Sequence, residues 1–125
     1  MATDAFFPAD SYYDLVRAME EYIMMFCTVP SADVGRKIAL GLIDAKLVPC
    51  VNIVPGLKSL YMWKDKFNED DELLLLIKTR RSLFEAVRDK IKELHPYEVP
   101  EIIATRIVAG YQPYLDWIKD NTNGE

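Results

Sequence analysis

The chain has 125 residues, the size of a single domain, and is long enough to bury a hydrophobic core. Half of its residues are hydrophobic and 28% are charged, which is typical of a folded protein. The net charge of −5, without any basic cluster interleaved with aromatics, argues against nucleic-acid binding. No apolar run approaches the roughly 20 residues that cross a bilayer, and the N-terminus lacks the features of a secretory signal, so we expect no membrane association.

Two cysteines, Cys27 and Cys50, lie inside apolar runs and form no CxxC motif. Two isolated thiols do not provide the network of bridges that holds small secreted domains together. We therefore expect both thiols to be reduced and the protein to be cytoplasmic.

The first twenty residues form an extension ahead of the main domain. Ser11 and Asp14 have the spacing of a helix capping box, with Asp in the position usually held by Glu. The apolar side chains that follow, up to Met19, keep the spacing of one helix face. The sequence thus predicts a short amphipathic helix within residues 1–20 and a separate domain over residues 21–125.

The main domain begins with a strand–helix–strand pattern. Residues 22–29 are a continuous apolar run that is too short for a helix and is stopped by a proline, which is typical of a buried strand. Ser31 or Asp33 suits the N-cap of the helix that follows. Residues 48–54 return to strand character, and a Pro-Gly pair after them predicts a break.

Two more strands and an acidic turn follow. A strand over 57–63 leads into an acidic turn over 64–72. This turn lacks the alternating ligand spacing and the central glycine of a calcium loop, which favours a solvated hairpin tip. Periodicity does not separate helix from strand for residues 73–77, but five residues between a turn and a helix start favour a strand.

The last third of the chain contains a helix, a stiff connection, a strand and a closing helix. Ser82 and Glu85 have the capping-box spacing and predict a helix start at Ser82. Two prolines within residues 94–101, which we call the arm, predict an extended and rigid segment. A strand over 102–108 comes next, and Pro113 suits the first turn of the closing helix.

The order β-α-β-β-α-β, with additions at both ends, indicates an α+β fold. It predicts a ferredoxin-like split β-α-β antiparallel sheet with an added C-terminal helix. Two helices cover one face of such a sheet, yet residues 22–26 and 73–77 are apolar at every position instead of alternating. Burying each extra Leu or Ile contributes roughly 1.5 to 3 kcal/mol. We therefore expect neighbouring chains to pack their sheets together in a closed homo-oligomer.

Several short motifs stand in order along the chain. They are Cys-Thr-Val-Pro at 27–30, Cys-Val-Asn-Ile-Val-Pro-Gly at 50–56, Ile-Lys-Thr at 77–79, the arm at 94–101 and Tyr-Leu-Asp-Trp at 114–117. Together they resemble the CutA family, the divalent-cation tolerance proteins. The resemblance implies a homotrimer of ferredoxin-like subunits, a link to tolerance of copper and other divalent cations, and no established enzymatic reaction. We expect no organic cofactor.

The resemblance also implies two copper ligands. The cysteine of the Cys-Thr-x-Pro motif is Cys27, and the histidine before Pro-Tyr is His95; where some bacterial members carry a second histidine, this chain has Leu94. Thiolate and imidazole suit copper, so Cys27 and His95 are the candidate metal ligands, with Cys50 and Glu98 as weaker candidates. The competing interpretation is that Cys27 is a small core residue and His95 a helix cap or a satisfied core group.

Two other functions stay open. A PII-like trimeric sensor of small ligands would bind an anion near Lys78, Arg80 and Arg81, at the start of the helix that follows them. A scaffold would dock a protein partner of unknown identity through its loops and the end that carries Trp117. We do not expect an enzyme, because no activated nucleophile or cofactor motif accompanies the acid–base residues of the arm.

Overall fold

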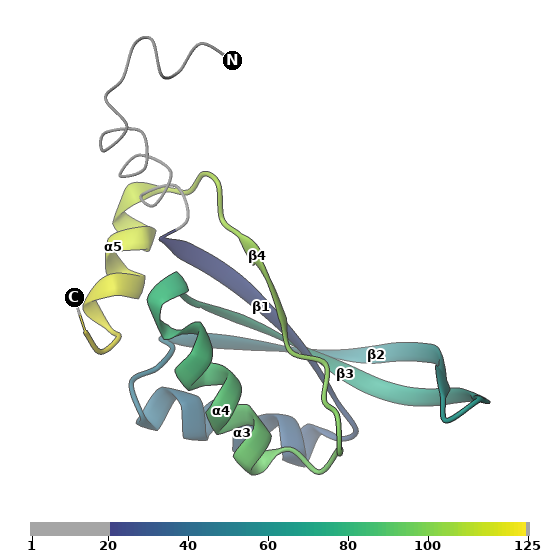
Figure 1. Ribbon diagram of the computed structural model, residues 1–125. Coiled ribbons are helices and arrows are strands. Elements are labelled where there is room, and N and C mark those ends of the chain that lie inside the picture. Colours follow the sequence, from purple (N-terminus) through teal and green to yellow (C-terminus); the bar gives the residue numbers. More distant parts are fainter. Residues whose placement is uncertain (1–20, 125) are drawn as a thin grey trace, which may run out of the picture.

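The computed structural model describes residues 21–124, which form one four-stranded sheet with helices packed against it (Figure 1). The elements are β1 (Tyr22–Val29), α3 (Ala32–Asp44), β2 (Cys50–Trp63), β3 (Lys66–Arg80), the 3-10 turn η1 (Arg81–Leu83), α4 (Phe84–Leu94), β4 (Ile103–Arg106) and α5 (Gln112–Asp120). The strands are antiparallel in the spatial order β2-β3-β1-β4. The α+β class and the β-α-β-β-α-β order are confirmed. The helix predicted within 1–20 lies outside the described residues.

One face of the sheet, covered by α3 and α4, forms the core. Alternate side chains of β1 point into it, because successive residues of a strand face opposite sides of a sheet. Apolar side chains of both helices complete the cluster. Its buried members are Ile23, Met25, Cys27, Val29, Ile38, Leu42, Val48, Leu75, Ile77, Val87 and Ile91. Cys27 is therefore a member of the hydrophobic core.

The opposite face of the sheet is covered only in part. Helix α5 packs against one end of it, next to β3, and its Ile118 is fully buried. Beyond α5, the register pairs Phe26 with Leu76 and Thr28 with Leu74, and these four side chains are only partly buried. The apolar side chains of this face are thus not fully buried by residues 21–124.

Strand β2 corrects one prediction. Separate strands were predicted over 48–54 and 57–63, but β2 is continuous from Cys50 to Trp63. A register shift between Val54 and Leu57 takes up the Pro-Gly pair without ending the pairing with β3. Gly56 allows this because it adopts a φ of 83°, a left-handed value that favours glycine.

The turn between β2 and β3 corrects a second prediction. It consists of Lys64 and Asp65, whose φ values of 50° and 63° are those of the tight two-residue turns that match the twist of paired strands. The acidic turn predicted over 64–72 is therefore wrong, since β3 begins at Lys66. The acidic side chains after the turn lie along a strand, and Glu72 is buried with 6% of its surface exposed.

The start of α4 corrects a third prediction. Ser82 does not cap a helix: it lies in η1, and α4 begins at Phe84 without a side-chain cap. The N–H of Arg81 donates to the carbonyl of Glu21 over 2.7 Å. This backbone bond, next to the start of β1, fixes the chain just before Ser82, where the side-chain cap was expected. A 3-10 turn then leads into the helix.

The other helix signals are confirmed. Ser31 caps α3, accepting a hydrogen bond of 3.2 Å from the N–H of Val34, and Pro113 lies in the first turn of α5. Strand β4 is shorter than the predicted 102–108. Within residues 21–124, no helix has the length and apolar character needed to span a bilayer.

Candidate functional site

The arm leaves α4 because of its first proline. Pro96 disfavours helical geometry at the residue before it, and His95 is extended, with φ −86° and ψ 136°. The N–H of His95 still donates to the carbonyl of Ile91 over 2.8 Å, so His95 is the C-cap of α4. The arm thus starts from a fixed point at the end of a helix.

Both ring nitrogens of His95 are engaged. The N–H of Tyr97 donates to Nδ1 over 3.2 Å, and Nε2 lies 2.8 Å from the carbonyl oxygen of Thr28. Because a carbonyl only accepts and Nδ1 is already accepting, the geometry assigns a neutral imidazole with its proton on Nε2. His95 is therefore a nearly buried histidine, 8% exposed, whose ring hydrogen bonds are satisfied within the protein. This agrees with the interpretation that competes with metal binding.

Cys27 contacts the same carbonyl oxygen. Its Sγ donates to the oxygen of Thr28 over 3.7 Å, and the residue is fully buried. Burial, reinforced by the charges of Glu101 and Glu72, raises the pKa of the Cys27 thiol to about 12. The thiol is therefore protonated at neutral pH.

The structure thus brings the two principal ligand candidates together at one atom. A metal ion bound by Cys27 and His95 would take the place of the thiol proton and of the proton on Nε2. Moving the imidazole proton to Nδ1 would set it against the N–H of Tyr97, so the arm would have to shift. The donor types and their convergence fit copper, whereas the protonated thiol and the imidazole tautomer oppose it. Among residues 21–124, no group of three or more His, Cys, Asp or Glu side chains is arranged to hold a metal.

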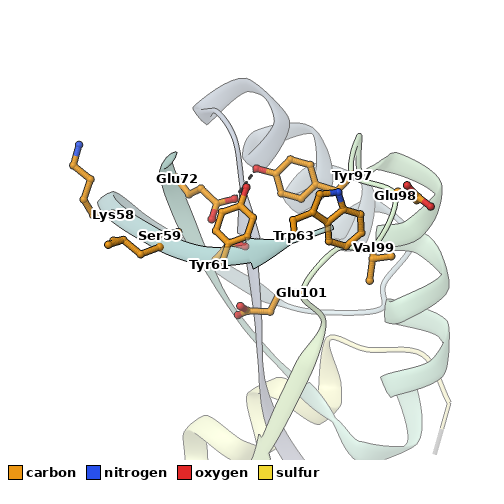
Figure 2. Close-up of a pocket in the computed structure, with 11 residues that line it drawn as sticks. Lys58, Ser59, Tyr61, Trp63, Glu72, Tyr97, Glu98, Val99 and Glu101 are labelled. Atoms are coloured by element: carbon orange, nitrogen blue, oxygen red, sulfur yellow. Dashed lines mark hydrogen bonds between the residues drawn. The ribbon is translucent and has the colours of Figure 1, made fainter. Parts of the chain in front are cut away.

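A cavity of about 630 Å³ opens beside this point (Figure 2). The hydroxyl of Tyr97 donates to the carboxylate of Glu72 over 2.6 Å inside it, and desolvation and Glu72 together raise the pKa of that hydroxyl. The cavity is lined by Thr28, Lys58, Ser59, Leu60, Tyr61, Trp63, Glu72, Tyr97, Glu98, Val99 and Glu101. Residues of the β2–β3 hairpin and of the arm therefore share one cavity.

The two weaker ligand candidates lie elsewhere. Glu98 lines the cavity, and its Oε1 is 3.9 Å from the ammonium of Lys64. Cys50 pairs with Lys78 across the strands, and the Lys78 ammonium lies 3.9 Å from its Sγ, on the face of the sheet opposite the core. The structure does not bring Cys50 to Cys27 and His95.

The three basic residues of the sensor hypothesis have different partners. Arg80 is buried and donates through Nε to the hydroxyl of Thr122 over 3.0 Å. Arg81 is exposed and forms an ion pair of 3.6 Å with Glu85. Lys78 lies beside Cys50, so the three cations do not point to one common anion.

Sequence reasoning missed most of the cavity. Tyr61 and Trp63 stand two residues apart on β2 and therefore share one side of the strand, which was a usable signal. Glu72 was hidden by its assignment to a turn, and Glu101 by the lack of any local pattern around it. Only Glu98 was predicted as a site residue.

Comparisons with known proteins agree on the family. The family model described as CutA1 divalent ion tolerance protein matches residues 23–121. The Divalent-cation tolerance protein CutA of Thermus thermophilus is 50% identical over 104 residues, which cover 83% of this chain and 99% of that protein. Protein CutA, chloroplastic, of Arabidopsis thaliana is 45% identical over 100 residues, covering 80% of this chain and 55% of the relative, so the chain spans about half of that longer protein.

Solved structures give the same result. The divalent cation tolerance protein of Thermus thermophilus has a TM-score of 0.80 at 48% identity, covering 82% of this chain and 99% of that one. CutA1 of Oryza sativa has a TM-score of 0.81 at 44% identity, covering 84% of this chain and 96% of its own. The match of sequence and of fold over the described domain leads to one conclusion: the chain belongs to the CutA1 divalent ion tolerance protein family.

Proposed function

We propose that this chain works in the cytoplasm as a homotrimer that binds copper or a related cation without catalysing a reaction. The observation that carries the metal-binding part is the convergence of the Cys27 thiol and the His95 imidazole on the carbonyl oxygen of Thr28. The family, named for divalent ion tolerance and not for an enzymatic activity, supports a non-enzymatic function.

The part of the sheet face opposite α3 and α4 that residues 21–124 leave uncovered supports the assembly. Phe26 and Leu76 are paired on this face and partly exposed, and Ile103 beside them is 56% exposed. Covering each such side chain contributes roughly 1.5 to 3 kcal/mol. A closed ring of identical chains buries such a face in every copy, which favours a symmetric assembly over an open one.

The outer half of the β2–β3 hairpin gives a second argument. The pairing of β3 with β1 begins at Leu73, so within residues 21–124 the part of the hairpin nearer the turn pairs only with itself (Figure 1). A two-stranded ribbon is marginally stable alone in water. This one carries Leu60, Met62 and Phe67 with 59%, 65% and 65% of their surfaces exposed. Contacts with other copies would stabilise it.

Metal binding at the Thr28 carbonyl would be coupled to the arm. The proton on His95 must move from Nε2 to Nδ1, and the N–H of Tyr97 then loses its acceptor. Tyr97 is only partly buried, and leaving its N–H without a partner costs up to about 1–3 kcal/mol, so the arm would move to give this N–H another acceptor. Tyr97 also holds Glu72 in the cavity, and a metal-induced shift of the arm would therefore change the cavity. In this proposal, the protein would respond to metal binding by a shift of the arm and a change in the shape of the cavity.

Copper titration of the full-length protein under reducing conditions tests the site. We expect Cys27→Ser and His95→Asn each to weaken binding at least tenfold, and the matched control Cys50→Ser to leave it unchanged. Calorimetry in buffers of different ionisation enthalpy should show about one proton released per metal, from the Cys27 thiol. Equal affinity in wild type, Cys27→Ser and His95→Asn would remove the proposed site.

Sedimentation tests the assembly. We expect wild type to sediment as three chains at micromolar concentration, and Leu76→Lys to dissociate because it places a charge on the uncovered face. The exposed residue Lys92 of α4 provides a control, since Lys92→Gln lies on the outer surface of a helix that already covers the core. A stable wild-type monomer would overturn the assembly.

A further inference from the structure

The cavity has an unusual combination of side chains. Three aromatic rings, those of Tyr61, Trp63 and Tyr97, line it together with the carboxylates Glu72, Glu98 and Glu101 (Figure 2). The face of an aromatic ring carries partial negative charge, and each carboxylate adds a full one. Both kinds of group attract cations.

The charge balance of the cavity is negative. Among its eleven lining residues, Lys58 is the one basic side chain against three carboxylates. Its ammonium is neutralised by Asp71, whose Oδ1 lies 2.5 Å from Nζ. An anionic ligand would therefore meet net repulsion there, and a cationic one net attraction.

The chain itself shows which kind of cation suits this place. The Lys64 ammonium lies 5.7 Å from the centre of the Trp63 ring and 3.9 Å from Oε1 of Glu98. An alkylammonium group thus already rests between an aromatic ring and a carboxylate at the edge of the cavity. Both side chains of this ion pair are more than 70% exposed in the single chain, so a ligand that enters the cavity can compete for the ring and the carboxylate.

We propose that this cavity binds a small organic cation of the methylated or quaternary ammonium class. Such a cation is weakly hydrated and is held by ring faces and by nearby negative charge, without coordinating any single oxygen atom. A bare metal ion needs several oxygens on one point, and the described residues offer no such group. The volume of about 630 Å³ is within the range of small-ligand sites. The proposal does not require a metal at Cys27 and His95, although a shift of the arm on metal binding would also change this cavity through Tyr97 and Glu72.

Calorimetry on the full-length, metal-free protein tests the proposal with choline as the probe. The matched probe is the neutral isostere of choline, in which a tert-butyl group replaces the trimethylammonium group. We expect saturable binding of choline, roughly tenfold tighter than that of the isostere, because only the charged compound gains the interaction with the rings and carboxylates. No binding of choline, or equal binding of both compounds, would overturn the proposal.

Variants locate the binding. The two tryptophans are matched, since Trp63 lines the cavity and Trp117 lies on α5, each with 41% of its surface exposed. Trp63→Ala should weaken choline binding about tenfold, and Trp117→Ala should leave it unchanged. Lys64→Gln should strengthen it severalfold by freeing the ring and Glu98, while Glu98→Gln, which keeps the shape of the side chain, should weaken it. If Trp63→Ala and Glu98→Gln both bind choline as wild type does, the cavity is not the site.

Discussion

The hydroxyl of Tyr97 reaches the buried carboxylate of Glu72 across 2.6 Å, and this bond ties the arm to β3. Tyr97 also fixes His95, through the bond from its own N–H to Nδ1. One residue of the arm thus holds the metal-ligand candidate with its backbone and the cavity with its side chain.

Removing the Tyr97 hydroxyl should destabilise the fold. Tyr97→Phe leaves the Glu72 carboxylate without this donor while only 6% of the residue is exposed, so we expect a loss of about 1–3 kcal/mol in the free energy of unfolding. Denaturant unfolding at a fixed protein concentration measures it. The control is Tyr61→Phe, which removes an exposed hydroxyl bonded to Asp70 and should change stability by less than about 0.5 kcal/mol. Equal losses in both variants would contradict the structural importance of the Tyr97–Glu72 bond.

The buried thiol of Cys27 should make the protein sensitive to alkaline pH. Its pKa is raised from 9.0 to about 12 in the folded chain, so the unfolded chain loses this proton first as the pH rises. The stabilisation is complete below pH 9 and is lost progressively toward pH 12, by at most about 1.4 kcal/mol per pH unit. Unfolding curves of wild type and Cys27→Ala from pH 8 upward, in reductant, should show a steeper loss in wild type. Parallel curves would mean that Cys27 ionises equally in both states.

Two serines that look alike in the sequence should differ in their effect. Ser31 accepts the N–H of Val34 at the start of α3, and Ser31→Ala should cost about 1 kcal/mol. Ser82 makes no cap bond, so Ser82→Ala should cost less than about 0.5 kcal/mol. Thermal unfolding of the pair decides this prediction. A large effect of Ser82→Ala would indicate that the helix starts at Ser82 in solution.

The C-terminal end should contribute to stability through a buried arginine. Arg80 is 1% exposed, and its Nε donates to the hydroxyl of Thr122 over 3.0 Å. Thr122→Val keeps the shape but removes this acceptor, so we expect a loss of about 1–3 kcal/mol, because hydrogen bonds to charged groups are stronger than neutral ones. The neighbouring control is Asn121→Ala, which removes an exposed bond to the backbone of Trp117 and should have a smaller effect. Chemical unfolding of the two variants, side by side, gives the comparison.

Local chemistry predicted much of the fold. The cap at Ser31, the proline at the start of α5 and the apolar strand over 22–29 each depend on neighbours in the sequence, and the structure confirms them. The break expected at Pro55-Gly56 was wrong because pairing with β3 continues across it, and pairing partners distant in sequence are invisible to a local pattern. The helix cap predicted at Ser82 was wrong for the same kind of reason, since the N–H of Arg81, just before it, bonds to the carbonyl of Glu21, which is distant in sequence.

The site was predictable only in part. Cys27 and His95 came from a family resemblance, and their meeting at Thr28 depends on the packing of β1 against the end of α4. The cavity depends on the reach of the β2–β3 hairpin toward the arm, which joins residues about thirty-five positions apart in the sequence, such as Tyr61 and Tyr97. No local periodicity or motif shows that residues so far apart in the sequence meet in one cavity.

The two cysteines of the chain face opposite sides of the sheet, Cys27 in the core and Cys50 on the other face. A bridge between them would have to pass through the backbone of the sheet, so oxidation has no route to an internal disulfide. An oxidant would reach Cys50 first, because Cys27 is fully buried, and the product would be a mixed disulfide or a covalent link between two molecules. Redox damage to this protein would therefore show itself as cross-linked chains on a non-reducing gel.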